Sequence, residues 1–350
     1  FVTTTRVTHA TPAALYSHVN HRDWECDSEI PKKYQSCIKD IARQLVEDSP
    51  GRNFKVIMGG GWNPLGVTSV LDEDESCIRQ DGLNIVDYWT EDKRMRNLKC
   101  NYVNSSKSLM SLDIQKTDCV LGIFGYGHVP YKAVREETPP EEPSLVDMTS
   151  QAIRILQKEK EGYVLMLAMM ETSELDDAIK KALSMTDRYD TLIIVTADHS
   201  HAFTINGYPK RGNDILGFAN KTDNEFPYET LTYANGPSYY YHRNNDSKDV
   251  NDTWRIPSED RGNIYYQHFA PIYLEDETHA GEDVPVYALG PQAHLLQGVH
   301  EQNYIAHVVS YASCIGPHSE MCQKPQTSAA LRTSYGINRI LIAFIFLFVI

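Results

Sequence analysis

The sequence predicts an α/β fold: a mixed central sheet with helices on both faces, interrupted by an inserted surface domain. Short apolar runs alternate with helical patterns through the first two hundred residues, and the runs contain few polar side chains. Strands covered on both faces have such continuous apolar runs, and their alternation with helices is typical of layered α/β domains. After Gly207 the alternation stops, which indicates the insertion.

The predicted elements follow one another closely before the insertion and resume after it. Helices are predicted where apolar residues recur at helical spacing, over residues 32–47, 148–160, 171–185 and 301–313. Strands are predicted over the apolar runs 54–58, 119–124, 162–166, 191–196 and 284–289. The triple glycine Gly59-Gly60-Gly61 lacks the spacing and the lysine of a nucleotide-binding loop, so we expect a tight turn there.

Composition divides the chain into three parts. Residues 1–206 and 278–325 carry the alternating pattern and form the predicted α/β core. Residues 207–277 are rich in Asn, Asp, Gly and Tyr, which favours an inserted surface domain. Residues 326–350 form a C-terminal segment that ends in an apolar tail.

The charge balance restricts the partners of the protein. The chain has 33 basic and 47 acidic residues, a net charge of −14, so it lacks the basic surface that nucleic acid requires. We therefore expect no nucleic-acid partner. An acidic protein that handles anions must concentrate positive charge locally, and bound metal ions would do so.

The first candidate site follows the strand predicted over residues 191–196. Asp198 and His199 come directly after this strand, with His201 two residues further on. Open α/β sheets hold their ligands at the carboxyl ends of strands, and an Asp oxygen with a His nitrogen suits zinc. Taken alone, the pair has a simpler interpretation, in which Asp198 caps a turn beside a hydrogen-bonded histidine.

A second stretch makes the metal-site interpretation stronger. Residues 277–284, Glu-Thr-His-Ala-Gly-Glu-Asp-Val, place His279 among small and acidic residues just before another predicted strand. The stretch is one of several blocks in a fixed order, which are residues 2–12, 20–24, 56–61, 196–201, 207–209, 277–284 and 290–294.

This ordered set resembles animal alkaline phosphatases of the membrane-bound, glycolipid-anchored type, and the resemblance extends to about Cys322. It implies an alkaline phosphatase-like core with a crown-like inserted domain.

The resemblance implies a mechanism and a set of roles. In that family a serine on one zinc attacks phosphorus, hydroxide on a second zinc hydrolyses the phosphoserine, an arginine holds the phosphoryl oxygens, and magnesium lies nearby. By position, Arg22 matches the arginine. Asp198 and His199 match ligands of the serine-bearing zinc, His279 matches a ligand of the other zinc, and Thr11 matches a magnesium ligand. His9 and His201 match residues just outside the ligands. Phosphomonoester substrates and a homodimer are implied in the same way.

The chain departs from the family pattern at three places. By the resemblance, the nucleophilic serine and the first aspartate ligand belong upstream of Phe1, and no serine present takes over that role. A loop with a glutamate, an aspartate and a histidine is missing after Met166, where the chain continues through Leu167-Ala168-Met169-Met170 into Glu171. Phe124 is followed by Gly125 where vertebrate members have a calcium ligand; Glu142 matches another ligand position, so calcium is left open.

These departures leave two hypotheses from different classes. The first is an alkaline phosphatase of which this chain is a fragment, inactive as written. The second is a catalytically dead, surface-anchored glycoprotein with a binding or structural role, since one imidazole cannot hold zinc. A sulfatase or phosphodiesterase is disfavoured, because the blocks around His199 and His279 resemble the phosphatase branch.

The cysteines and sequons favour an oxidising, secreted setting. Cys314 and Cys322 are close enough in sequence to staple a loop, whereas Cys26, Cys77, Cys100 and Cys119 allow three pairings. By the resemblance, Cys37 would pair with a cysteine upstream of Phe1. The glycosylation sequons begin at Asn104, Asn220, Asn245 and Asn251.

The C-terminal tail gives the predicted location. Residues 340–350 are eleven apolar residues. As a helix they would reach only about 16 Å, short of the roughly 30 Å hydrocarbon layer. Small residues at Ser328-Ala329-Ala330, a polar spacer and this tail match a glycolipid (GPI) anchor signal with attachment at Ser328, on the extracellular face of the cell membrane. A short tail-anchored helix is the alternative.

Overall fold

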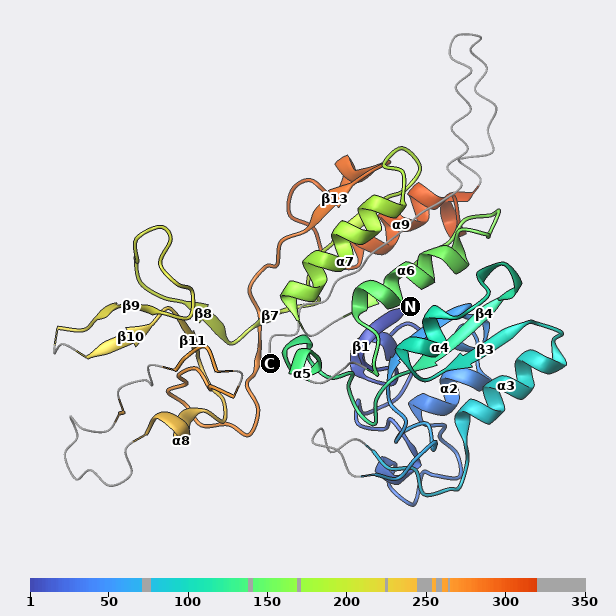
Figure 1. Cartoon of the computed structure of the whole chain (residues 1–350), viewed down its shortest axis with the longest axis horizontal. Coiled ribbons are helices and arrows are strands. Elements are labelled where there is room, and N and C mark those ends of the chain that lie inside the picture. Colours follow the sequence, from blue (N-terminus) through green and yellow to red (C-terminus); the bar gives the residue numbers. More distant parts are fainter. Residues whose placement is uncertain are drawn as a thin grey trace, which may run out of the picture. The chain divides into compact units, whose positions relative to one another are not determined.

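The computed structural model describes residues 1–70, 77–137, 141–168, 171–223, 226–243, 254–255, 260–263 and 265–319. These residues divide into two compact units (Figure 1). The first unit comprises Phe1–Asp198 together with the described residues from Pro285 onward, and the second is His199–Val284. The predicted insertion, residues 207–277, lies within the second unit.

A five-stranded sheet forms the centre of the first unit. Its strands are β1 (Val2–Arg6), β2 (Val56–Gly60), β3 (Cys100–Val103), β4 (Cys119–Ile123) and β5 (Leu167–Ala168), in the spatial order β3-β4-β2-β1-β5. Every pairing in this sheet is parallel. All five carboxyl ends therefore lie at one edge, where side chains following β1 and β2 can meet.

Helices cover both faces of this sheet (Figure 1). One face carries Val2, Val56, Met58 and Val120, and it packs against α4 (Ser106–Met110), α6 (Leu145–Leu156) and α7 (Thr172–Met185). The other face carries Ile57, Leu121 and Ile123, and it packs against α2 (Ile41–Glu47) and α3 (Ile85–Met95). Because successive strand residues point to opposite faces, the continuous apolar runs supply both cores. The predicted α/β fold class is confirmed, with a central sheet whose described strands are all parallel rather than mixed.

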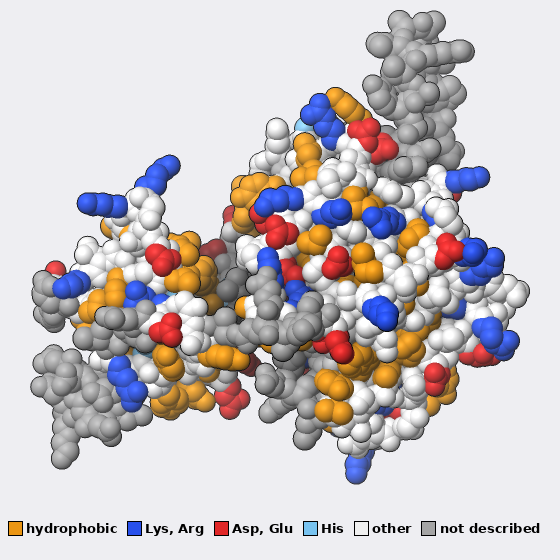
Figure 2. Space-filling model, viewed as in Figure 1, with side chains coloured by type: hydrophobic (Ala, Val, Ile, Leu, Met, Phe, Trp, Pro, Cys, Tyr) orange, Lys and Arg blue, Asp and Glu red, His pale blue; other side chains and the backbone are white. Residues whose placement is uncertain are grey.

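A smaller antiparallel pair completes the first unit. β6 (Ile193–Val195) pairs with β13 (Tyr287–Leu289), and apolar residues from both pack against α9 (Tyr304–Ser313). The remaining helices of this unit are α1 (Ala10–Ala13), α5 (Lys132–Glu137), η1 (Asp27–Glu29), η2 (Gly51–Asn53), η3 (Ile114–Lys116), η5 (Ala293–Leu296) and η6 (Gly316–His318). On the face of the molecule drawn in Figure 2, basic and acidic side chains are interspersed.

Three predictions of local structure were wrong. The helix predicted from residue 32 begins only at Ile41, because the Asp40 side chain accepts the Arg43 amide and caps it there. The strand predicted over residues 162–166 lies later, at β5, since Gly162 has φ +88° and the pairing with β1 starts at Leu167.

The triple glycine is the third of these corrections. Gly59 and Gly60 belong to strand β2, and only Gly61, with φ +114°, leaves the extended conformation. A Cβ at Gly60 would collide with the carbonyl oxygen of Gly127. The glycines therefore permit the close approach of a neighbouring loop rather than a tight turn.

The second unit consists of short antiparallel ladders. Its elements are β7 (Ser200–His201), β8 (Phe203–Ile205), β9 (Phe218–Lys221), β10 (Pro227–Glu229), β11 (Leu231–Tyr233), α8 (Tyr239–His242) and β12 (His279–Ala280). The paired strands are β7 with β12, β8 with β11, and β9 with β10. The buried Glu229 organises the unit, because it accepts hydrogen bonds from the Tyr266 hydroxyl at 2.5 Å and the Phe269 amide at 3.1 Å.

The structure selects one of the three possible cysteine pairings. Cys26 is bonded to Cys77, and Cys100 to Cys119. Cys37 is exposed and forms no disulfide within the described residues, so its pairing with an upstream cysteine stays a prediction. The predicted bridge from Cys314 ends at Cys322, which lies outside the described residues. Among the described helices, none has the length and apolar character needed to cross a bilayer.

Candidate active site

A buried ion pair organises the chain beyond the carboxyl end of β1. The Arg6 guanidinium donates to both carboxylate oxygens of Glu25, with Nε–Oε2 at 2.9 Å and Nη2–Oε1 at 2.8 Å. The Thr8 hydroxyl also donates to Glu25 Oε2, at 2.5 Å. Burial alone would raise the pKa of Glu25, but the hydrogen bonds and charge of Arg6 and the Thr8 hydroxyl outweigh it and lower that pKa.

His9 lies between two partners at the same edge of the sheet. Arg22 Nη2 is 3.2 Å from His9 Nε2, and since a guanidinium can only donate, Nε2 accepts and Nδ1 carries the ring proton. The His128 ring meets the His9 ring edge-on, with centroids 5.1 Å apart. Burial, with help from His128 and Arg6, lowers the pKa of His9 to about 3. His9 is therefore a neutral acceptor that orients the exposed Arg22.

Thr11 and Asp198 meet although 187 positions separate them. The short helix α1 buries Thr11, whose hydroxyl lies 3.5 Å from Asp198 Oδ2. Asp198 follows the end of β6, and its carbonyl accepts a 2.7 Å hydrogen bond from Gln302 Nε2. The first unit thus brings together two of the predicted ligands, one for magnesium and one for zinc.

The second unit gathers three histidines. The ladder between β7 and β12 places His279 opposite His201, and the His199 ring stacks on His279 with centroids 3.7 Å apart. His199 Nδ1 lies 2.8 Å from the Ser200 carbonyl oxygen, which can only accept. Nδ1 therefore carries the proton and Nε2 carries the lone pair, the tautomer that many metal-binding histidines adopt.

The donor types suit zinc, but the described residues do not complete a site. The His199 and His279 rings are stacked, with an angle of 18° between their planes. Their lone pairs therefore lie in separate, nearly parallel planes, so the two residues could not both bind one ion. A catalytic zinc usually takes three protein ligands. Within the described ranges, no group of three or more His, Cys, Asp or Glu residues is arranged to hold a metal ion.

Some predicted site residues lie where no structure can be given. Cys322, Ser328, Asn245, Asn251 and the apolar tail fall outside the described residues. The other two sequon residues, Asn104 and Asn220, are exposed, as glycosylation requires.

Sequence reasoning missed Glu25 and His128. Glu25 lies between Trp24 and Cys26, which was a weak signal of burial, whereas nothing in the sequence pointed to His128.

A parallel α/β sheet with titratable side chains gathered beyond the carboxyl ends of its strands defines an α/β protein whose candidate site lies where such folds bind ligands. The alkaline phosphatase family profile matches residues 1–315, and the chain belongs to this family. Alkaline phosphatase 4 of Drosophila melanogaster is 43% identical over 351 residues, which cover 90% of this chain and 58% of that protein.

Two further comparisons gave more distant matches. A membrane-bound alkaline phosphatase of Bombyx mori is 33% identical over 364 residues, covering 98% of this chain and 64% of that protein. The crystal structure of Thermus thermophilus alkaline phosphatase aligns with 60% of this chain and 41% of its own, at 23% identity and a TM-score of 0.44. The chain spans about three fifths of the length of the two curated relatives.

Proposed function

We propose that the complete protein hydrolyses phosphate monoesters as an alkaline phosphatase, through a phosphoserine intermediate. The observation that carries this proposal is the arrangement of Arg22, His9, Thr11 and Asp198 at one end of the first unit, in a chain that belongs to the family. The cationic and metal-ligating residue types that a phosphate dianion requires are therefore supplied by neighbouring segments.

Arg22 is the proposed phosphate-binding residue. Its planar guanidinium can donate to two phosphate oxygens at once, and its exposure leaves donors available beyond the one directed at His9. His9 positions Arg22, because its Nε2 lone pair accepts a hydrogen bond from Arg22 and fixes the direction of the guanidinium. The neutral ring adds no charge of its own, so Arg22 supplies the attraction for phosphate.

The proposed metal ligands follow the order of the family's sequence blocks. Asp198 and His199 would bind one zinc, His279 a second, and Thr11 a magnesium ion, with His201 just outside the ligands. These ions would polarise the phosphoryl group and activate the attacking oxygens. Since the described residues hold no complete set of ligands, the remaining donors must come from other residues of the complete protein.

The proposed setting is the outer surface of the cell. A GPI anchor attached at Ser328 would replace the apolar tail, which would otherwise expose an aggregation-prone surface. The membrane-bound Bombyx mori relative supports this proposal. Glycosylation at the four sequons and a homodimer belong to the same proposal.

A second candidate is a surface protein without catalytic activity. The described residues contain only an incomplete set of metal ligands, which supports this candidate.

Turnover of a chromogenic phosphate ester separates the two candidates. The protein to assay is a restored protein, in which the family segments expected upstream of Phe1 and between Met166 and Glu171 are present. It should hydrolyse the ester and lose activity to a metal chelator. The 350-residue chain, purified away from host phosphatases, should give only background turnover. Turnover by the 350-residue chain would overturn the assignment of roles, and an inactive, metal-loaded restored protein would favour the non-catalytic candidate.

A further inference from the structure

The segment that carries Arg22 has no regular structure of its own. Residues 14–26 are turns, bends and irregular chain, and none of them belongs to a strand or helix. Two backbone contacts tie the end of the segment to α2, where the Ile41 and Ala42 amides donate to the carbonyls of Trp24 and Glu25 at 2.9 and 3.2 Å. Such a segment needs other attachments if Arg22 is to keep one position.

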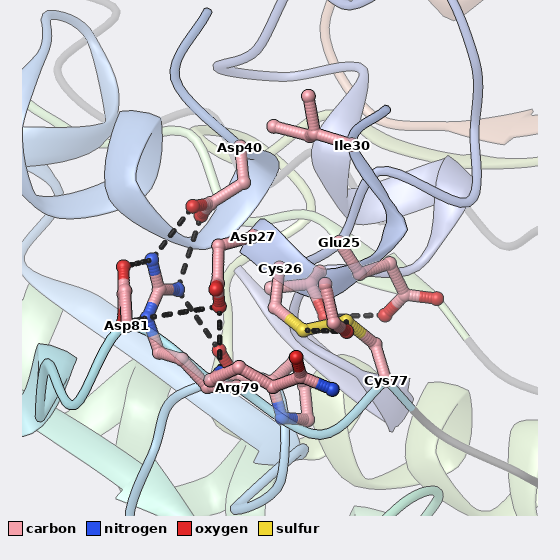
Figure 3. Close-up of a disulfide and its surroundings, with 12 residues drawn as sticks. Glu25, Cys26, Asp27, Ile30, Asp40, Cys77, Arg79 and Asp81 are labelled. Atoms are coloured by element: carbon pink, nitrogen blue, oxygen red, sulfur yellow. Dashed lines mark hydrogen bonds and ion pairs between the residues drawn. A yellow bond between two sulfur atoms is a disulfide. The ribbon is translucent and has the colours of Figure 1, made fainter. Parts of the chain in front are cut away.

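Three consecutive side chains provide these attachments. Glu25 binds Arg6 at the end of β1, Cys26 is bonded to Cys77, and the Asp27 carboxylate accepts the Gln80 amide at 3.0 Å. Cys26 is fully buried. Figure 3 shows the disulfide beside Glu25, with Asp27 directed toward the segment that follows Cys77. The disulfide is the covalent member of this set, four residues from Arg22.

Cys77 is itself firmly held, through Arg79 (Figure 3). The Arg79 side chain is only 1% exposed. It binds Asp40, the N-cap of α2, at 2.7 and 3.2 Å, and Asp81 through two contacts of 2.8 Å. Asp27 lies 3.9 Å from the same guanidinium. Opening the cluster would separate a buried guanidinium from all of these carboxylates, so the cluster resists local opening.

We propose that the Cys26–Cys77 disulfide and the Arg79 cluster form a strut that positions Arg22 for phosphate binding. The proposal rests on the proposed function, because it takes Arg22 as the phosphate-binding residue. Cys26, Cys77 and Arg79 are positioning residues: they act through the backbone of residues 22–27. Without the disulfide, the segment would sample more conformations, and phosphate binding would have to order it again.

The second disulfide of the first unit provides a matched control. Cys100 and Cys119 are the first residues of β3 and β4 and are direct partners in the parallel ladder. They lie at the amino ends of the strands, whereas Arg6 ends β1 at the carboxyl edge. The double variants C26S/C77S and C100S/C119S therefore each remove one disulfide of the same unit, but only the first affects the strut.

Hydrogen exchange tests the mechanical part without any activity. In the 350-residue chain, amides of residues 20–27 should exchange on the order of tenfold faster in C26S/C77S than in C100S/C119S or the unaltered chain. Equal exchange in all three would overturn the strut. If C26S/C77S does not fold, Asp81→Asn replaces it, because it keeps the disulfide and weakens the hold on Arg79; it should speed the same amides.

Phosphate binding to the restored protein tests the link to Arg22. C26S/C77S should bind inorganic phosphate on the order of tenfold more weakly, with KM raised more than kcat is lowered and zinc content unchanged. In an Arg22→Ala background the same double substitution should cause no further loss, because the strut acts through Arg22. The same loss in that background, or an equal loss from C100S/C119S, would overturn the proposal. Failure of the unaltered restored protein to bind phosphate would instead contradict the proposed function.

Discussion

The contact between Arg22 and His9 shows how one hydrogen bond fixes two side chains. Because the guanidinium has no acceptor, the ring must present a lone pair at Nε2, and burial keeps that ring neutral. In the proposed enzyme, His9 would therefore orient Arg22 without competing for the phosphate charge. The proposal assigns two tasks, holding the substrate and holding the metal ions, to different residues.

Arg22→Ala should separate these tasks in the restored protein. Phosphate affinity should fall by a factor of ten or more, since hydrogen bonds to charged groups contribute about 1.5–3 kcal/mol. Zinc content, measured by metal analysis, should stay unchanged, because Arg22 contacts no proposed metal ligand. Arg22→Lys is the control: it keeps the charge but loses the planar fork, so it should restore only part of the affinity.

Glu25 is a buried carboxylate whose pKa is lowered by its partner Arg6 more than it is raised by burial. Its folded-state pKa is lower than the ordinary value of 4.5, so its contribution to stability is present above that value and is lost as pH falls through the folded pKa. Glu25→Gln should lower the free energy of unfolding at pH 7 by about 3–5 kcal/mol, because Arg6 is left buried without its counter-charge.

Denaturant unfolding across the acid range checks this prediction for Glu25. The stability difference between the unaltered chain and Glu25→Gln should be constant above the ordinary pKa and should narrow as the pH falls below it. A difference that stays the same down to the acid limit of folding would show that Glu25 is not the ionised partner of Arg6.

The candidate site was predictable where neighbouring residues in sequence are also neighbours in space. His9, Thr11 and Arg22 come from adjacent blocks after one strand, so a linear pattern could indicate them. Glu25 and His128 pair with Arg6 across 19 and 122 positions, and no local pattern encodes such a partner. The stacking of His199 on His279 likewise depends on a ladder between strands far apart in sequence.

At the scale of elements, apolar runs predicted strands at β2, β4, β6 and β13 but not at β1 or β3, and capping and close packing decided where strands and helices begin and end. The continuous run in β4 places Leu121 on one face and Val120 on the other, which indicated two covered faces. Helix α2 begins later than predicted, at Ile41, because the Asp40 side chain both caps the helix and binds Arg79. Helical periodicity alone does not detect such a cap.

Gly60 gives a prediction at this scale. Gly60→Ala would bring a Cβ against the Gly127 carbonyl, so β2 and the loop that follows β4 must separate. We expect the free energy of unfolding to fall by about 1–3 kcal/mol, as for other overpacked interiors. Gly262→Ala, where a Cβ meets nothing within 4 Å, is the matched control and should change stability by less than about 0.5 kcal/mol. Equal unfolding midpoints for both variants would contradict the close approach at Gly60.

At the scale of the whole molecule, the chain is an alkaline phosphatase family member, and the residues proposed to bind phosphate and metal come from several separate segments. Arg22, Thr11 and Asp198 belong to the first unit, while His199, His201 and His279 belong to the second. Roles for these residues could be proposed only from the ordered blocks, because composition and periodicity indicate a layered core without specifying its chemistry.

Metal analysis of the restored protein is the measurement that tests this account most directly. The unaltered protein should bind about two zinc ions per chain, and His279→Ala should bind about one and lose most of its turnover, because each ion depends on its own ligands. His294→Ala, at a histidine outside the proposed ligands, serves as the control and should keep both ions. Full zinc content and full rate in His279→Ala would contradict the assignment of this chain's histidines to a catalytic metal centre.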